Sequence, residues 1–231
     1  MARMIVGGEF IYTWGQMAME HIVLLSAYVS NVERQLELGL DQFVSHRDTG
    51  KHGEGTPFEI EYEVLDGMSD HDWDVEGIYA DTFPNLHRSS VFLTLCATFE
   101  HQLNVLCKHY QQERKLRVAF TDLKGRGVNR AEEYLTKVVG LTLDSRDSQA
   151  TWKHLRDTYR VRNIIAHSDG RLEDRHMEER RVIEQSRHLS LKGNEIRLSA
   201  GFLPDVLDRF RGVVLIIDQA DRIWRSATRP Q

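Results

Sequence analysis

The sequence predicts a mainly α-helical protein, an up-and-down helical bundle that carries a small β-hairpin and an acidic N-terminal insertion. Apolar residues recur at helical spacing over long stretches in the first third, the middle and the last thirty residues. One short segment has the turn chemistry of a hairpin. With 231 residues, of which 41% are hydrophobic, the chain is long enough to bury a full core.

We expect a single domain (1–231) built from five consecutive parts. In chain order they are a long N-terminal helix (1–48), an acidic insertion (49–81), a core that ends in a helix with a polar motif (82–170), a charged loop followed by a hairpin (171–200), and a C-terminal helix (201–226).

The N-terminal helix is predicted over residues 10–45 because its apolar residues repeat every three or four positions. A first stripe consists of Trp14, Met17, His21, Leu24 and Tyr28. A second stripe, Leu25, Val29, Val32 and Leu36, widens the apolar face. A face this wide indicates a bundle helix that contacts two neighbours.

The insertion is strongly acidic, with ten Asp and Glu residues between 54 and 81. Residues 58–64 alternate apolar and charged side chains, which predicts a short strand. Residues 70–74 hold three aspartates, but they lack the glycine pivot and distal glutamate of an EF-hand, so we expect no metal there. The segment is either a solvated insertion or a phosphate mimic that shields the basic part of the chain.

Start and stop signals place the helices of the core. Pro84 predicts the first turn of a helix that runs to about residue 111. Asn129 has the spacing of a capping box for a short helix that stops at Gly140. Asp144 or Ser145 then caps the helix that carries the motif.

The clearest local signal is a hairpin over residues 189–198. A two-residue Gly193-Asn194 turn pairs Leu191 with Ile196 and Leu189 with Leu198. After it, the C-terminal helix carries an apolar seam suited to core packing, made of Leu203, Val206, Phe210, Val213, Ile217, Ala220 and Trp224.

The charge is unevenly distributed along the chain. The net charge is −5, but residues 1–80 hold 4 basic and 15 acidic side chains, which leaves +6 for residues 81–231. The two cysteines give neither a disulfide framework nor a metal knuckle. No run is apolar enough for a membrane span or a signal peptide, so we expect a cytoplasmic protein that needs no membrane.

The candidate functional site is the motif at residues 160–170, where a segment with helical periodicity meets a predicted helix stop at Asp169-Gly170. Arg162 and His167 enclose an apolar Ile-Ile-Ala, and Asn163 adjoins the arginine. The same spacing occurs at Arg47/His52, around a predicted turn, and at Arg171/His176, in a charged run with few apolar residues. Only the pair at 162 and 167 ends a helix that has an apolar stripe.

These residues resemble the HEPN superfamily, helical domains whose RNases carry an R-x4-6-H motif, often as Arg-Asn-x3-His, at the end of a core helix. The resemblance extends more loosely over residues 85–225 and implies a HEPN-like bundle. It also implies an endoribonuclease, typically of a toxin–antitoxin or antiviral defence system, that acts as a homodimer with a composite site. An antitoxin or regulatory protein would then be a further partner.

The side chains suit RNA cleavage without a metal ion or other cofactor. An imidazole titrates near neutral pH, so His167 can serve as the general base for the 2'-hydroxyl or as the acid for the 5'-oxygen. Arg162 offers two donors for the phosphate oxygens, and Asn163, one turn before His167, can hold the imidazole or a phosphate oxygen. The products would be a 2',3'-cyclic phosphate and a 5'-hydroxyl.

Further residues have supporting roles in this hypothesis. Lys153 and Arg156, together with Arg160, share one helix face. From these residues alone a solvated face is the default interpretation, and in the RNase hypothesis they position the RNA backbone. Glu100 interrupts the apolar band of the preceding helix, so it needs a partner such as Arg160 or Arg162. In the HEPN superfamily an acidic residue often packs against the motif, which favours this pairing.

Two other function classes stay open. The chain could be a non-catalytic HEPN-like dimerisation or interaction module, in which His167 simply caps the helix. It could also be a nucleotide-binding partner of a separate nucleotidyltransferase. A Gly-rich phosphate loop, a G-x-S-x-G elbow and an H-E-x-x-H motif are all absent from the sequence, so other common enzyme classes have little support.

Overall fold

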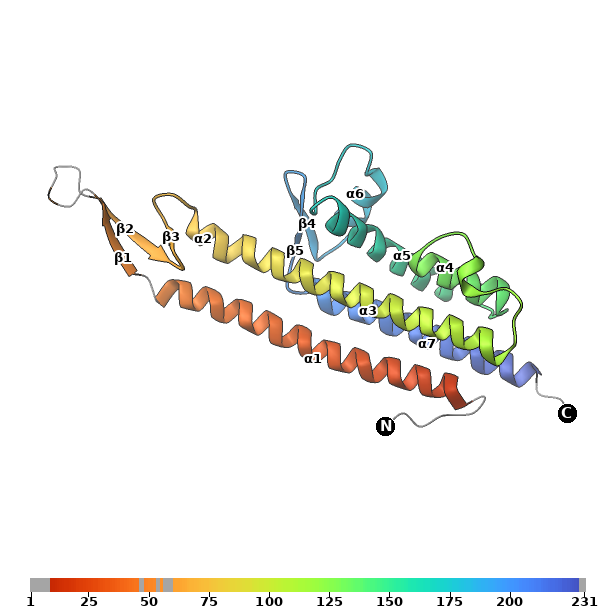
Figure 1. Cartoon of the computed structure of the whole chain (residues 1–231). Helices are drawn as coiled ribbons and strands as arrows, with labels where there is room; N and C mark the ends of the chain where they lie inside the picture. Colours follow the sequence, from red (N-terminus) through yellow and green to blue (C-terminus); the bar gives the residue numbers. More distant parts are fainter. Residues whose placement is uncertain (1–8, 46–47, 53–54, 56–59, 229–231) are drawn as a thin grey trace.

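Within the described residues (9–45, 48–52, 55 and 60–228), four long helices run alongside one another in this computed structural model (Figure 1). They are α1 (Glu9–Ser45), α3 (Phe83–Glu113), α5 (Arg146–His167) and α7 (Phe202–Thr228). Each of α1 and α5 packs against both α3 and α7, so α1 lies on one side of a central α3–α7 pair and α5 on the other. Neighbouring helices along the chain alternate in direction, and the prediction of a mainly helical bundle is confirmed.

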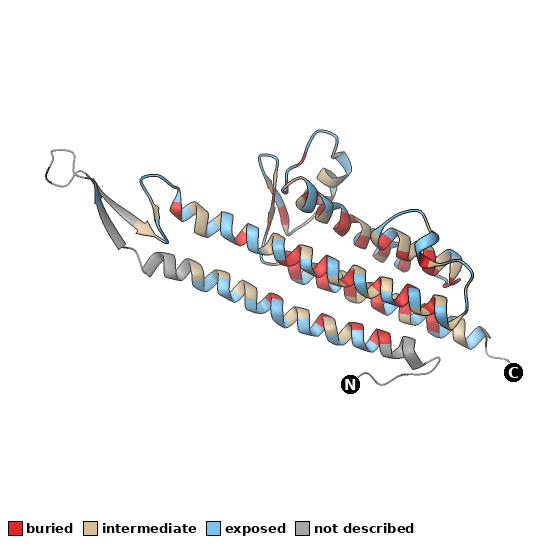
Figure 2. Cartoon of the chain, viewed as in Figure 1, coloured by how far each residue is buried: buried red, intermediate tan, exposed pale blue. Residues whose placement is uncertain are grey.

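The core lies between the central pair and its two covering helices (Figure 2). The rings of Phe99 on α3 and Phe210 on α7 stack with their centroids 4.1 Å apart. On the α5 side, the hydroxyl of Tyr159 donates a hydrogen bond to the backbone oxygen of Cys96 (2.6 Å). These contacts fix α5, and with it the motif, against α3.

Helix α1 uses only part of its wide apolar face. Trp14 and Val29 are buried against the bundle, and His21 is half-buried beside the amide of Gln102 (3.1 Å). Leu24 and Tyr28 of the first stripe remain 64% and 48% exposed. The two neighbours that the sequence predicted for this helix are α3 and α7, and part of the apolar face extends beyond the contact with them.

The acidic insertion forms a small antiparallel sheet of β1 (Asp48–His52), β2 (Ile60–Leu65) and β3 (Met68–Ser69), in that order. The predicted strand is confirmed from residue 60, while 58–59 lie outside the described residues. The turn expected at 48–51 was wrong, since these residues pair with β2. Within the described part, no group of three or more His, Cys, Asp or Glu side chains is arranged to bind a metal ion.

Short elements connect the insertion and the long helices. Helix α2 (Val75–Gly77) and a π-helical turn (Ile78–Thr82) lead into α3. A 3₁₀ turn (Phe120–Asp122), helix α4 (Gly127–Glu133) and a second π-helical turn (Tyr134–Val138) lead from α3 towards α5.

The helix signals in this connection were only partly right. Helix α4 begins two residues before Asn129, and its N-cap residue Arg126 makes no side-chain capping bond, so the predicted capping box was wrong. The stop at Gly140 is confirmed, with φ at +79°. Ser145 caps α5, because its hydroxyl accepts a hydrogen bond from the N–H of Ser148 (3.2 Å).

The hairpin of β4 (Leu189–Lys192) and β5 (Glu195–Leu198) has the predicted register, with Leu191 opposite Ile196. The segment before it is not the predicted loop throughout, since it contains helix α6 (Met177–Glu184). Ile183 of α6 is buried, and this single anchor among charged residues was too weak a periodic signal to predict a helix.

Candidate functional site at the end of helix α5

Helix α5 ends immediately after the motif. Asp169 and Gly170 have positive φ angles of 50° and 68°, a backbone conformation that ends a helix. The N–H groups of Ser168 and Gly170 both donate to the carbonyl of Ile164, at 2.9 and 3.2 Å. The predicted stop is thus confirmed, and His167 occupies the last turn of the helix.

The hairpin holds this helix end in place. The N–H of Ile196 donates to the carbonyl of Gly170 (2.9 Å), and the N–H of Leu172 donates to that of Asn194 (2.8 Å). The amide of Asn85 on α3 in turn bonds the backbone of β5 at Ile196 and Leu198. Helix α3, the hairpin and the end of α5 therefore form one connected support for the motif.

The three motif side chains lie on two faces of α5. Asn163 and His167 are one turn apart and both exposed. Arg162 and His167 are five positions apart, so an α-helix turns them about 140° away from each other. The guanidinium of Arg162 nevertheless reaches the exposed face, where its Nη1 donates to Oδ1 of Asn163 (3.1 Å). Asn163 thus connects the arginine to the histidine face.

The inner part of Arg162 lies near α3. Its Nε is buried and has no hydrogen-bond acceptor among the described residues. Burial raises the pKa of the Cys96 thiol, while the Arg162 cation lowers that pKa and the Glu100 carboxylate raises it. Burial also raises the pKa of Tyr159, and here again the Glu100 carboxylate raises the pKa while the Arg162 cation lowers it. Arg162 and Glu100 therefore lie around one buried region.

Glu100 forms no ion pair with either arginine named in the sequence analysis, as far as the described residues show. Arg160 bonds Asp157 instead (3.1 Å), and Glu100 packs against the backbone near Gly127, where an added Cβ would lie 3.5 Å from its Oε2. Glu100 can therefore act on the motif only through its charge.

The cations of the expected RNA track are paired with carboxylates. Lys153 and Arg160 both contact the buried Asp157, at 2.7 and 3.1 Å, and Arg156 donates to Glu132 of α4 (2.7 Å). The first two pairs lie within α5, whereas Arg156 and Glu132 are 24 residues apart in sequence. These three side chains share an exposed flank of α5, but their charges are largely compensated.

A pocket of about 270 Å³ lies on the opposite flank of the helix end. Its walls come from α3 (Ser89, Ser90 and Leu93), from the end of α5 (Ile165 and Asp169) and from β5 (Glu195). None of the motif side chains Arg162, Asn163 and His167 lines it. Sequence reasoning did not find this pocket, because it depends on the hairpin packing against α3, more than 100 residues away in sequence.

No family model, curated protein or solved structure matches this chain. The resemblance to HEPN domains consequently depends on the motif and on its place at the end of a bundle helix. No helix of the described residues combines the length and the apolar character that crossing a bilayer requires.

Proposed function

We propose that this chain is a metal-independent, HEPN-type endoribonuclease. The observation that carries the proposal is the end of α5, where Asn163 and His167 share an exposed face and Arg162 contacts Asn163. A phosphate placed over Asn163 would be within reach of a cation and of an imidazole. These are the two groups that cleavage by an internal nucleophile requires.

In the proposed reaction, the 2'-oxygen attacks phosphorus after losing its proton to a general base. The bond from phosphorus to the 5'-oxygen then breaks, and a general acid protonates that oxygen. Arg162 stabilises the charge that builds on the non-bridging oxygens. Each copy of the motif brings a single histidine, so a second copy of the chain would supply the other proton-transfer group, and RNA would be bound between the two motifs.

The test is incubation of the full chain with mixed RNA in EDTA, followed by analysis of the new ends. We expect 2',3'-cyclic phosphate and 5'-hydroxyl ends with the natural protein, and at least a hundredfold slower cleavage with His167→Ala. His154→Ala is the matched control, because His154 is also exposed on α5 but lies outside the motif. Equal loss with both variants, or cleavage that survives His167→Ala, contradicts the proposal.

A second candidate is a non-catalytic interaction module with a HEPN-like fold. The pairing of Lys153, Arg156 and Arg160 with carboxylates favours it, because these cations are not free to receive a phosphate backbone. If neither the natural protein nor His167→Ala cleaves RNA, this candidate replaces the nuclease. The toxin or defence setting, and with it an antitoxin partner, belongs to the nuclease proposal alone.

A further inference from the structure

Helix α1 presents an apolar stripe to solvent along much of its length. Its large members are Met17, Leu24, Tyr28 and Leu38, which are 58%, 64%, 48% and 47% exposed. They lie on the flank of α1, not on the face that packs against α3 and α7, which is formed by residues such as Ala18 and Val29. Leu24 and Tyr28 lie one turn apart at its centre, His21 on its edge contacts Gln102 of α3 (3.1 Å), and the exposed Asn31 and Gln35 separate Tyr28 from Leu38.

The spacing of the stripe is that of a coiled-coil seam. Residues 17, 21, 24, 28, 31, 35 and 38 alternate in steps of four and three, the pattern of positions that face a partner helix. His21, Asn31 and Gln35 are the polar members of the series. Single polar residues in such a seam lower stability but fix the alignment of the two helices. The series therefore indicates a second helix in a defined register.

We propose that the missing helix is α1 of a second copy of this chain, packed antiparallel about a twofold axis. In this alignment Leu24 packs on the partner's Tyr28 and Met17 on the partner's Gln35. Because the axis relates the two chains, each of these contacts occurs twice. The central layers are then an aliphatic side chain against an aromatic ring, and the polar members lie towards the ends.

Charge complementarity selects both the partner and the direction. Arg34 is exposed and has no ion-pair partner among the described residues, and Glu20 bonds only the amide of Gln16 (3.1 Å). Both occupy the flanking position just before a seam residue, and flanking positions of this kind meet each other in an antiparallel pair. The alignment that places Leu24 on the partner's Tyr28 also places Glu20 beside the partner's Arg34.

A parallel pair does not satisfy these charges. It would place Glu20 beside the partner's Leu25 and Arg34 beside the partner's Gly39. A membrane surface is also a poor occupant, because Arg34 is the only lysine or arginine between residues 9 and 45, and anionic lipids attract helices with several. A second copy, by contrast, carries the complementary charge at the required distance along the helix.

This inference goes beyond the proposed function and does not depend on it. Helix α5 lies on the other side of the α3–α7 pair, so the central pair separates α1 from the helix that carries the motif (Figure 1). The contact would hold in the nuclease and in the interaction module alike.

Sedimentation equilibrium of the full chain over a range of concentrations tests the proposal. We expect the natural protein to be a dimer and Leu24→Glu to be a monomer, because the substitution places a charge in two symmetric apolar layers. Val23→Glu is the matched control, since Val23 is equally exposed (63%) but lies outside the seam, and it should dimerise as the natural protein does. Circular dichroism of each variant establishes that the bundle is folded.

A charge exchange tests the antiparallel register. Glu20→Arg alone should weaken dimerisation about tenfold, Arg34→Glu alone should do the same, and the double variant should recover the natural affinity. A natural protein that is monomeric at 100 µM (about the concentration where a weak dimer is populated) overturns the proposal. Dimerisation that survives Leu24→Glu, or that Val23→Glu disrupts as strongly, also overturns it. A double variant without recovery refutes the antiparallel alignment.

Discussion

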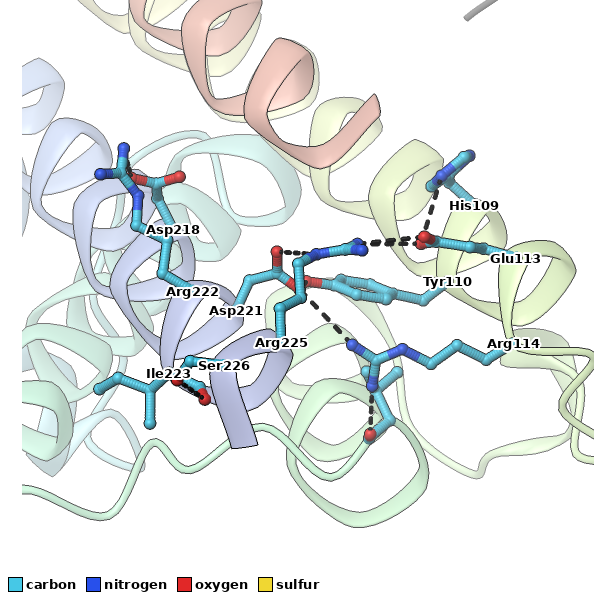
Figure 3. A network of polar contacts seen from close by, with 11 residues as sticks. His109, Tyr110, Glu113, Arg114, Asp218, Asp221, Arg222, Ile223, Arg225 and Ser226 are labelled. Carbon is cyan, nitrogen blue, oxygen red and sulfur yellow. Dashed lines mark hydrogen bonds and ion pairs between the residues drawn. The ribbon is translucent and has the colours of Figure 1, made fainter. Parts of the chain in front are cut away.

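Replacing Asp221 by alanine should destabilise the bundle more than any exposed charge replacement on the same helix. Asp221 lies on α7 and is only 3% exposed. Its carboxylate accepts hydrogen bonds from the hydroxyl of Tyr110 (2.8 Å) and from Nε of Arg225 (2.6 Å), as Figure 3 shows, with Arg114 at 3.5 Å. One carboxylate thus joins the ends of α3 and α7.

The protonation states make this cluster sensitive to the loss of the carboxylate. Burial is the main cause that raises the pKa of Tyr110, and Asp221 raises it further, so the phenol stays a hydrogen-bond donor. Burial lowers the pKa of Arg114, whose guanidinium stacks on the ring of Trp224 with 3.4 Å to the centroid. Without Asp221, the phenol would lose its acceptor, and Arg114 would keep only the carbonyl of Val139 (2.7 Å).

The magnitude follows from what remains after the substitution. Removing one partner of a buried ion pair costs about 3–5 kcal/mol. Arg225 is 26% exposed and keeps a second partner in Glu113 (3.1 Å), so the lower end of that range applies. For a domain of this size, a loss of about 3 kcal/mol lowers the melting temperature by roughly 6–12 °C.

Thermal unfolding followed by circular dichroism measures this effect. Asp208→Ala on the same helix is the control, because its pair with Arg211 is exposed and should be worth less than about 1 kcal/mol. Asp221→Asn, which keeps an acceptor but removes the charge, should lie between the two. If Asp221→Ala and Asp208→Ala lower the melting temperature equally, the cluster does not hold these helix ends together.

Two further predictions concern pH and RNA binding. Burial, opposed by Glu113 and assisted by Arg225, lowers the pKa of His109 below its ordinary value, so the unfolded state takes up a proton first as the pH falls. The melting temperature should therefore drop as the pH falls below about 6.5, and His109→Gln should reduce this drop. If the melting temperature of His109→Gln depends on pH as that of the natural protein does, His109 is not the group responsible. If Arg156 contacts RNA, Glu132→Gln should release it and tighten binding severalfold, with a salt dependence steeper by about 0.7. Glu133→Gln, which removes the neighbouring charge that pairs with Lys137 (2.7 Å) and not with Arg156, should leave both quantities unchanged in the same filter-binding assay.

The features that could be predicted from the sequence are those that depend on neighbouring residues. The Gly193-Asn194 turn specifies its own strand register, and the positive φ angles at Asp169 and Gly170 end the motif helix within the residues that predicted it. Ser145 likewise caps the helix that follows it directly. In each case one or two local hydrogen bonds determine the outcome, so the pattern and the structure agree.

The features that could not be predicted depend on residues far apart in the chain. The apolar periodicity of α1 predicted two neighbours, which are α3 and α7, but it could not show that Leu24 and Tyr28 would stay exposed beside that contact. The compensation of Arg156 by Glu132 requires α4 to pack beside α5. The motif spacing identified Arg162 and His167 as candidate site residues. It could not show that Nε of Arg162 is buried, because that depends on how α5 packs against α3.

The contact through α1 and the contact through the motif ends are both proposed between copies of the chain. Together they predict how RNA cleavage should respond to a substitution in the α1 stripe. Packed helices lie about 8–10 Å apart, so pairing through α1 leaves each α5 two helix layers away from the α1 contact, on the other side of its own central α3–α7 pair. A composite site then needs a second contact through the motif ends, which forms only when RNA binds between two motifs. The free protein is a dimer through α1, and two different twofold contacts per chain in the presence of RNA give a tetramer or an open chain. Leu24→Glu should therefore abolish pairing through α1 and leave RNA cleavage per chain unchanged, whereas His167→Ala should do the reverse. A folded Leu24→Glu protein that no longer cleaves RNA would mean that the motifs meet through the α1 stripe, and the arrangement inferred from the bundle would be wrong.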